Sequence, residues 1–192
     1  MVSELKLLLI ACVSAVVFSG CLTSAPPPPK SWVVSASRKH SSELMVDRVA
    51  RLGSLSVAAP YDKPALAVVR KDGSVAFDRY NVFASSPSAL LRMPLAALLE
   101  NDGRFGRVLA SASTARANST IEAVVTDLSL DCREDGKRVA RVSVSLAVIE
   151  NREISMFLDG TGSSDAASGD YSAAFSEAFA EAVAEALKTM SK

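Results

Sequence analysis

The side chains that could do chemistry are few, and they are scattered along the chain. The only histidine is His40, which has no cysteine or paired carboxylate close to it in the sequence. A lone histidine makes a poor metal site, and it is a poor catalytic base without a positioned nucleophile. Serines are numerous, but the G-x-S-x-G pattern of a nucleophile elbow does not occur. We therefore expect a protein that is not an enzyme and that uses no cofactor and no metal.

The acidic pairs Asp127/Asp131 and Asp131/Glu134 could serve acid–base catalysis, but they lie where polar and apolar residues alternate. This alternation predicts a β-hairpin with one face in water, and we expect the carboxylates on that face to be solvated. Cys132 has the same phase as the apolar Leu130, which predicts a buried and unreactive thiol.

A row of acidic residues near the C-terminus, Glu177, Glu181 and Glu185, repeats every four positions. This spacing places the three carboxylates on one face of a helix, where like charges repel slightly. Two interpretations remain open. The row is either a solvated helix face or a surface that meets a basic partner.

The N-terminus carries an export signal. The apolar run of residues 5–18 is shorter than the roughly 20 residues that a transmembrane helix needs, and small residues follow it. Residues 18–21 read Phe-Ser-Gly-Cys, which resembles the bacterial lipobox, with Phe18 at the position where leucine is usual. We expect a lipoprotein signal peptide over residues 1–20 and acylation of Cys21. The alternative is an ordinary signal peptide cleaved nearby, with an incidental thiol at Cys21.

The residues after Cys21 suggest an address and a tether. Leu22 stands where aspartate typically retains such lipoproteins in the inner membrane, so we expect anchoring in the outer membrane, facing the periplasm. N-terminal acyl chains would hold the protein to the lipid. Pro26 to Pro29 favour an extended polyproline rod, which predicts a semi-rigid tether over residues 21–30. A polyproline ligand for a partner's groove is the alternative.

Composition predicts one globular domain over residues 31–192. The chain has 192 residues, of which 49% are hydrophobic and 22% charged, and its formal net charge is zero. A neutral chain without basic clusters is a poor match for nucleic acid. Of the three cysteines, Cys12 leaves with the signal peptide and Cys21 is acylated, so Cys132 has no partner for an internal disulfide.

Alternating and helical patterns define the elements that must position these residues. Strands are expected at residues 32–34, 52–59 and 65–70, and the turn Asp72-Gly73 joins the last of these to a strand over 75–80. Ser86 and Pro87 begin a helix, in which the interior Pro94 predicts a kink.

The C-terminal half is expected to form three antiparallel strands, a loop and a helix. The strands cover residues 120–132, 138–150 and 154–158, with Val124 and Leu128 among the inward side chains, and a Ser/Gly/Asp loop spans 160–169. Asp170 caps the final helix, whose inward residues are Tyr171, Phe175, Phe179, Val183 and Leu187. The fold class predicted is α+β: a mainly antiparallel sheet with two principal helices packed on one face, in two layers.

Two stretches carry a family resemblance. Residues 55–70 read Leu-Ser-Val-Ala-Ala-Pro-Tyr-Asp-Lys-Pro and then Ala-Leu-Ala-Val-Val-Arg. The second stretch has Phe77-Asp-Arg79-Tyr80, Ser86-Pro87, Leu90-Leu91, Leu98-Leu99-Glu100 and Gly103-Arg-Phe105-Gly-Arg-Val108. Together they resemble the auxiliary lipoproteins of ABC-type transport systems with Mce-domain proteins. Tyr80 stands where that family usually has Trp, Ala65 replaces a common Gln, and Pro94 interrupts the helix.

The resemblance implies an accessory lipoprotein of a trans-envelope lipid transporter, acting by docking and as a possible homo-oligomer. Its partners would be the Mce-domain and ABC components. The exposed loop Tyr61, Asp62 and Lys63, together with Arg79 and Tyr80, is the predicted contact site. The alternative is a periplasmic lipoprotein that itself binds a lipid or another small apolar ligand.

Overall fold

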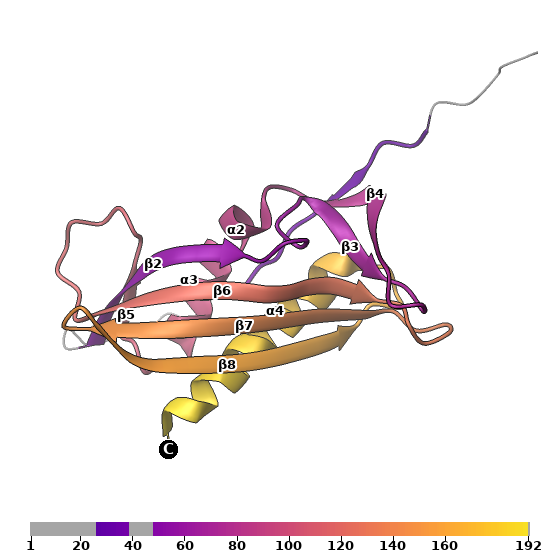
Figure 1. Cartoon of the computed structure of the whole chain (residues 1–192). Coiled ribbons are helices and arrows are strands. Elements are labelled where there is room, and N and C mark those ends of the chain that lie inside the picture. The colour runs from indigo at the N-terminus through magenta and orange to yellow at the C-terminus, as the bar shows by residue number, and fades with distance from the viewer. Residues whose placement is uncertain (1–25, 39–47, 192) are drawn as a thin grey trace, which may run out of the picture.

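The computed structural model describes residues 26–38 and 48–191, and it is built on one eight-stranded sheet (Figure 1). The predicted signal peptide, Cys21 and His40 lie outside these residues. The strands are β1 (Lys30–Trp32), β2 (Val49–Val57), β3 (Ala65–Val69), β4 (Val75–Phe83), β5 (Arg107–Leu109), β6 (Ser119–Asp131), β7 (Val139–Glu150) and β8 (Glu153–Asp165). The helices are α2 (Pro87–Leu90), α3 (Arg92–Asn101), α4 (Tyr171–Lys188) and the short 3₁₀ helix η2 (Thr189–Ser191).

The α+β class is confirmed, and the sheet is mixed: its longest ladders are antiparallel, but it also contains parallel pairs. The hairpins β3–β4, β6–β7 and β7–β8 are antiparallel, as expected from their turns. The pairs β1–β4, β2–β5, β2–β6 and β3–β6 are parallel. β6 is the centre, because β7 lies along one edge while β2 and β3 share the other edge in succession. The sequence did not predict the parallel pairs, because they join segments that no short turn connects.

A β-bulge in β6 changes which side chains face the core. The register with β7 shifts between Val125 and Asp127, so the inward phase passes from Val125 to Leu128. Val125 is buried, whereas Val124 is 40% exposed. The prediction that Val124 faces inward was therefore wrong, because one inserted residue reverses the alternation of every residue before it.

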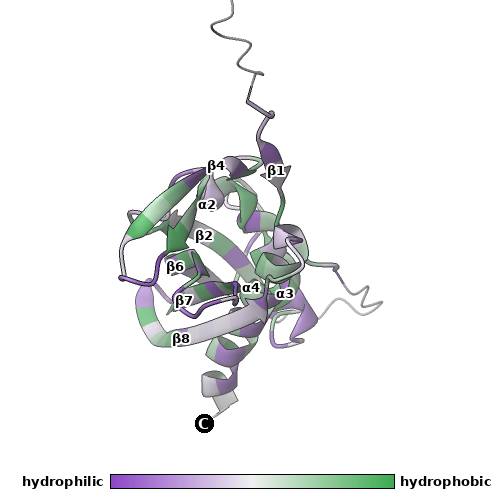
Figure 2. Cartoon of the chain, turned by 90° about the vertical axis from the view of Figure 1, so that its right-hand side faces the viewer, coloured by the Kyte–Doolittle hydropathy of each residue, from purple (hydrophilic) through white to green (hydrophobic). Residues whose placement is uncertain are grey.

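Helix α4 packs along β7 and β8 (Figures 1 and 2). The carboxylate of Asp170 accepts a hydrogen bond from the backbone N–H of Ala173, which confirms the predicted cap. The five inward residues predicted for this helix are all buried in the core. Edge-to-face ring contacts join two of them to other elements: Trp32 with Tyr171 and Phe83 with Phe175.

The segment predicted as a loop over residues 160–169 is in large part the end of strand β8. Gly160 and Gly162 lie beneath α4, where a Cβ atom on Gly162 would stand 2.6 Å from the backbone nitrogen of Ala182. Glycines in a sequence commonly indicate a loop. Here, because they have no side chain, they allow the backbone of a helix to approach a strand closely. The same pattern continues on the helix, where Ala178, Ala182 and Ala186 are fully buried.

The helix predicted to begin at Ser86 and Pro87 is divided into two helices. It ends as α2 at Leu90 and begins again as α3 at Arg92, with Leu91 between them. Pro94 thus stands in the first turn of α3, where a missing N–H costs little, instead of in a helix interior. The interruption falls three residues before the proline and not at Pro94 itself. Within the described residues, no helix is both long and apolar enough to cross a membrane.

Candidate functional site

The predicted contact loop follows β2 and is hydrogen-bonded at its start to the central strand β6. Tyr61 is half-buried and packs against the core, whereas Asp62 and Lys63 are exposed. Burial raises the pKa of the Tyr61 hydroxyl, with a further contribution from the Asp127 carboxylate. The Lys63 ammonium lies 5.0 Å from the centre of the Phe77 ring, a cation–π contact. The loop therefore presents a charged pair anchored by two aromatic rings.

Arg79 and Tyr80 occupy a separate place, in an irregular stretch of β4. The register with β3 jumps there from Asp78 to Val82, so the residues between bulge away from the sheet. The Asp78 carboxylate accepts hydrogen bonds from the backbone N–H groups of Tyr80 (2.8 Å) and Asn81 (3.1 Å). This arrangement fixes the bulge and leaves Tyr80 50% exposed.

The bulge lies beside the point where the proline segment enters the domain. Lys30 of β1 pairs with Asn81, and the indole N–H of Trp32 donates to the Asn81 side chain over 3.0 Å. Pro26 to Pro29, which the structure shows as exposed and without regular structure, lead directly into this strand. β1 begins at Lys30, inside the predicted tether. The structure thus places Arg79 and Tyr80 beside β1, where the proline segment ends, and it places Lys63 over the Phe77 ring.

Four exposed apolar side chains belong to β4 or directly follow β1. Val33 follows β1, and Val75, Phe77 and Tyr80 belong to β4; their exposed fractions lie between 37% and 50%. Neither Val75 nor Phe77 was among the contact residues predicted from the sequence. Their alternation with Ala76 and Asp78 marks a strand, but it does not reveal which face a neighbouring layer leaves open.

Asp131, which was expected on a solvated face, is not solvated. Asp131 is buried and forms ion pairs with Arg133 (2.7 Å) and Arg141 (2.6 Å). The hydrogen bonds from Arg133 hold the pKa of Asp131 well below its usual range. Asp131 is therefore an ionised structural anchor and not a proton donor. Glu134 is exposed and pairs with Lys137, as a surface residue would.

Asp127 was also expected in water, but it is partly buried and lies near the buried Ser129. Ser129 is only 1% exposed, and among the described residues neither its hydroxyl nor Oδ1 of Asp127 has a hydrogen-bond partner. The loop that follows β2 contacts this part of β6, where the backbone N–H of Ala58 donates to the carbonyl of Val125. Burial raises the pKa of Asp127. Burying these polar atoms costs free energy of folding.

Cys132 is half-buried, and burial raises the pKa of its thiol. A raised pKa keeps the thiol protonated at neutral pH, which agrees with the prediction of low reactivity. Among the described residues, no group of three or more His, Cys, Asp or Glu side chains is arranged to hold a metal ion.

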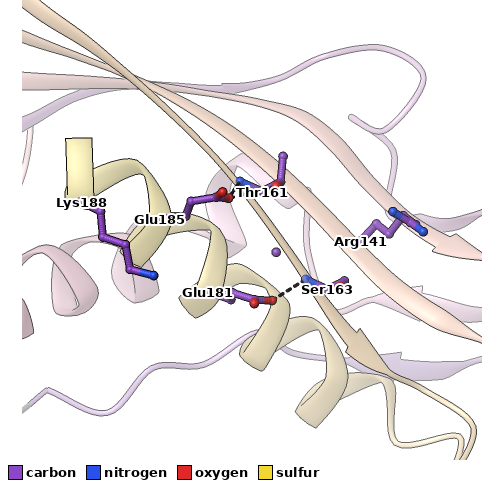
Figure 3. A pocket seen from close by; sticks show the side chains of 7 residues that line it. Arg141, Thr161, Ser163, Glu181, Glu185 and Lys188 are labelled. Carbon is purple, nitrogen blue, oxygen red and sulfur yellow. Dashed lines mark hydrogen bonds between the residues drawn. The ribbon is translucent and has the colours of Figure 1, made fainter.

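The acidic row on α4 binds the protein's own sheet (Figure 3). Glu185 accepts hydrogen bonds from the backbone N–H and the hydroxyl of Thr161, and Glu181 accepts from the backbone N–H of Ser163 at 2.8 Å. Glu177 accepts from the hydroxyl of Ser164. The bonds from Thr161 lower the pKa of Glu185. The row fastens the helix along β8, an interpretation that the sequence alone did not offer.

Comparison with known proteins supports the fold. No family model matches the sequence, and no curated protein matches it. Among solved structures, a Xanthomonas campestris protein of the family DUF330 is similar, with a TM-score of 0.58 and 14% identity. The match covers 85% of this chain and 91% of that one. At this identity the likeness shows a shared fold and nothing about function.

A weaker likeness is to PelC from Paraburkholderia phytofirmans, solved as a dodecamer. PelC is 12% identical with a TM-score of 0.39, and the match covers 82% of this chain and 94% of PelC. This score is too low to bear on the assembly of the present protein.

Proposed function

We propose that this protein is an outer-membrane-anchored accessory lipoprotein of an ABC-type, Mce-domain lipid transport system, and that it acts by docking. The observation that supports this most is the set of exposed side chains on β4, directly after β1 and in the loop before β3. Half of the large apolar side chains that are exposed in the described residues lie there: Val33, Val75, Phe77 and Tyr80. We name these four residues, together with Lys63 and Arg79, the β4 surface.

The β4 surface has the composition of a protein-binding patch. Aromatic side chains and arginine are enriched in binding hot spots, and exposed apolar clusters mark interaction sites. The Asp78 hydrogen bonds hold Tyr80 outward, and Lys63 fixes one side of the Phe77 ring. A pre-ordered surface loses little conformational entropy on binding, which favours docking.

The position of the tether suits this role. Because β1 is hydrogen-bonded beside β4, acyl chains on Cys21 would hold the β4 surface within reach of the lipid surface. Self-association is part of the same proposal, since a ring or dimer would repeat the surface around a transporter. Tethering then supplies half of the function, and recognition by the β4 surface supplies the other half.

The test compares two equal substitutions at exposed phenylalanines. Phe77→Asp alters the β4 surface, whereas Phe157→Asp alters β8, where Phe157 is 66% exposed. Each full-length variant is expressed in its native host, crosslinked in the membrane and purified, and the recovered transporter components are identified by mass spectrometry. We expect Phe77→Asp to lose the Mce-domain component and Phe157→Asp to retain it. Recovery of no ABC or Mce component with the unmodified protein would refute the proposal.

The anchoring half has its own experiment. A Cys21→Ala variant should fold normally and reach the periplasm, yet it should fail to restore the transport-dependent resistance of a deletion strain. Circular dichroism and fractionation check the fold and the location. Full complementation by the unanchored variant would show that tethering is dispensable.

A further inference from the structure

A groove separate from the β4 surface runs between helix α3 and strand β5. The chain reverses between Asn101 and Arg107, so β5 and the residues after it lie back along the helix. The groove has a volume of about 380 Å³, within the usual range for small-molecule sites of about 300–1,000 Å³. Its apolar floor and wall are formed by Leu52, Ala96 and Val108.

Three arginines line this apolar groove. Arg92 is the first residue of α3, Arg107 is the first residue of β5, and Arg38 follows the segment after β1. Arg92 donates to the carbonyl of Gly53 over 2.8 Å, which holds its guanidinium beside the floor. Among the described residues no carboxylate forms an ion pair with Arg92.

One carboxylate serves the other two arginines. Glu100, whose side chain is 7% exposed, lies 2.6 Å from Arg38 and 3.7 Å from Arg107. Its second task is structural, since Oε1 accepts the backbone N–H of Val108 over 2.8 Å. Arg38 and Arg107 thus share one carboxylate, and Arg92 adds a third positive charge. The groove therefore has a surplus of positive charge beside an apolar floor.

A second hollow adjoins the first and is almost wholly apolar. It has a volume of about 360 Å³ and shares Arg38 and Met93 with the groove between α3 and β5, which we name the arginine groove. Its remaining walls include Val34, Pro94 and Ala97, with Arg38 as its single charged residue. Met93 lines both hollows and is 68% exposed, so its side chain is accessible to a ligand.

We propose that these two hollows form a binding site for a single-chain amphiphile with an anionic head. The head, a carboxylate or a phosphate ester, is held by Arg92 and Arg107, and the alkyl chain passes Met93 into the apolar hollow. Charge complementarity selects the head, because arginine binds planar and tetrahedral anions through several N–H groups. The site is independent of the β4 surface and does not rest on the proposed docking function.

Binding is measured by isothermal titration calorimetry on the full chain carrying Cys21→Ala, purified without detergent. Sodium laurate and dodecyl phosphate, below their critical micelle concentrations, should each bind saturably at one site. Inorganic phosphate and dodecanol should bind at least about ten-fold more weakly, because each lacks one half of the ligand. Tighter binding of laurate would indicate a fatty acid as the natural ligand, and tighter binding of dodecyl phosphate a phosphate-headed lipid.

Variants separate charge from shape. Arg92→Gln should weaken both anionic probes about ten-fold, whereas Arg152→Gln, on the β7–β8 turn, should not. Met93→Glu places a negative charge at the rim and should weaken them similarly, while Met93→Gln retains most of the binding. Because Met93 is largely exposed, both of its variants should fold, and circular dichroism checks this.

Two results would overturn the site. The first is dodecanol binding as tightly as laurate, or no saturable laurate binding at all. The second is unchanged laurate affinity in folded Arg92→Gln and Met93→Glu. Salt provides a further check, since raising ionic strength should weaken laurate and leave dodecanol unaffected.

Discussion

Replacing Gly162 with alanine should weaken the packing of α4 on β8 and destabilise the protein, although the change adds only one methyl group. An ideal Cβ at this position would stand 2.6 Å from the backbone nitrogen of Ala182, and the carbonyl of Ala178 would be closer still. Ordinary contacts begin at 3.4 Å. The obstacle is helix backbone, which cannot rotate away as a side chain can. The helix would have to retreat by about 1 Å.

The expected loss can be worked from what α4 buries. Nine of its side chains lie in the core, among them Phe175 and Phe179, and a gap of about 0.5–1 Å forfeits a quarter to a half of each dispersion contact. Overpacking typically costs about 1–3 kcal/mol, and occasionally more. We therefore expect Gly162→Ala to lower the free energy of unfolding by about 3 kcal/mol. That reverses the gain of about 0.5–1 kcal/mol that alanine normally brings over glycine in a strand.

Gly53 supplies the matched control. It lies in β2, and a Cβ there would meet the side-chain atoms Thr120 Cγ2 at 2.9 Å and Glu122 Cγ at 3.2 Å, which can move. Gly53→Ala should change stability by less than about 1 kcal/mol. Urea unfolding of both variants, followed by circular dichroism, measures the difference. A Gly162→Ala protein within about 0.5 kcal/mol of the unmodified protein would refute the backbone-contact reasoning.

Three further predictions concern polar groups. Asp131→Asn should cost about 1–2 kcal/mol at pH 7, since Arg133 and Arg141 are about half exposed. Folding lowers the pKa of Asp131, so the stability that this carboxylate contributes is present above its ordinary pKa of 3.8 and is lost as the pH falls below that value. The difference in free energy of unfolding between Asp131→Asn and the unmodified protein should therefore shrink in acid. A difference that stays constant with pH would contradict this. Asp127→Asn should have the opposite sign, with equal or up to about 1 kcal/mol higher stability at pH 7, because the pKa of Asp127 is raised by burial. That advantage should disappear as acid protonates Asp127 in the unmodified protein, and a clear loss at pH 7 would show that its charge is stabilising. Asp170→Ala should cost about 1 kcal/mol through the lost cap and Asp170→Asn much less, both by thermal unfolding; equal losses would exclude the cap as the cause.

Local patterns in the sequence determined the elements that depend on neighbouring residues. The turn Asp72-Gly73 predicted the β3–β4 hairpin, and the apolar spacing of the last segment predicted α4 with its cap at Asp170. Such signals need only a few adjacent residues, because hairpin turns and caps are closed by short-range hydrogen bonds. Among the predicted contact residues, Tyr61, Asp62 and Lys63 also rest on a local signal, a polar aromatic loop between two prolines.

What the sequence could not supply were relations between distant segments. The bulge in β6 reverses the phase of Val124 and Val125, and only pairing with β7 places it there. The arginine groove joins Arg38, Arg92 and Arg107, which no local pattern connects.

The residues with chemical potential show the same division. The sequence by itself determined that they are few and scattered, and that Cys21 is the last residue of a segment that resembles the lipobox. Only the tertiary structure decided that Asp131 is an ionised anchor, that the glutamates of α4 bind β8, and that Gly160 and Gly162 admit the helix. The physical reason is that burial and partners set the charge state and the packing of a side chain, and both arise from segments that meet only when the sheet forms.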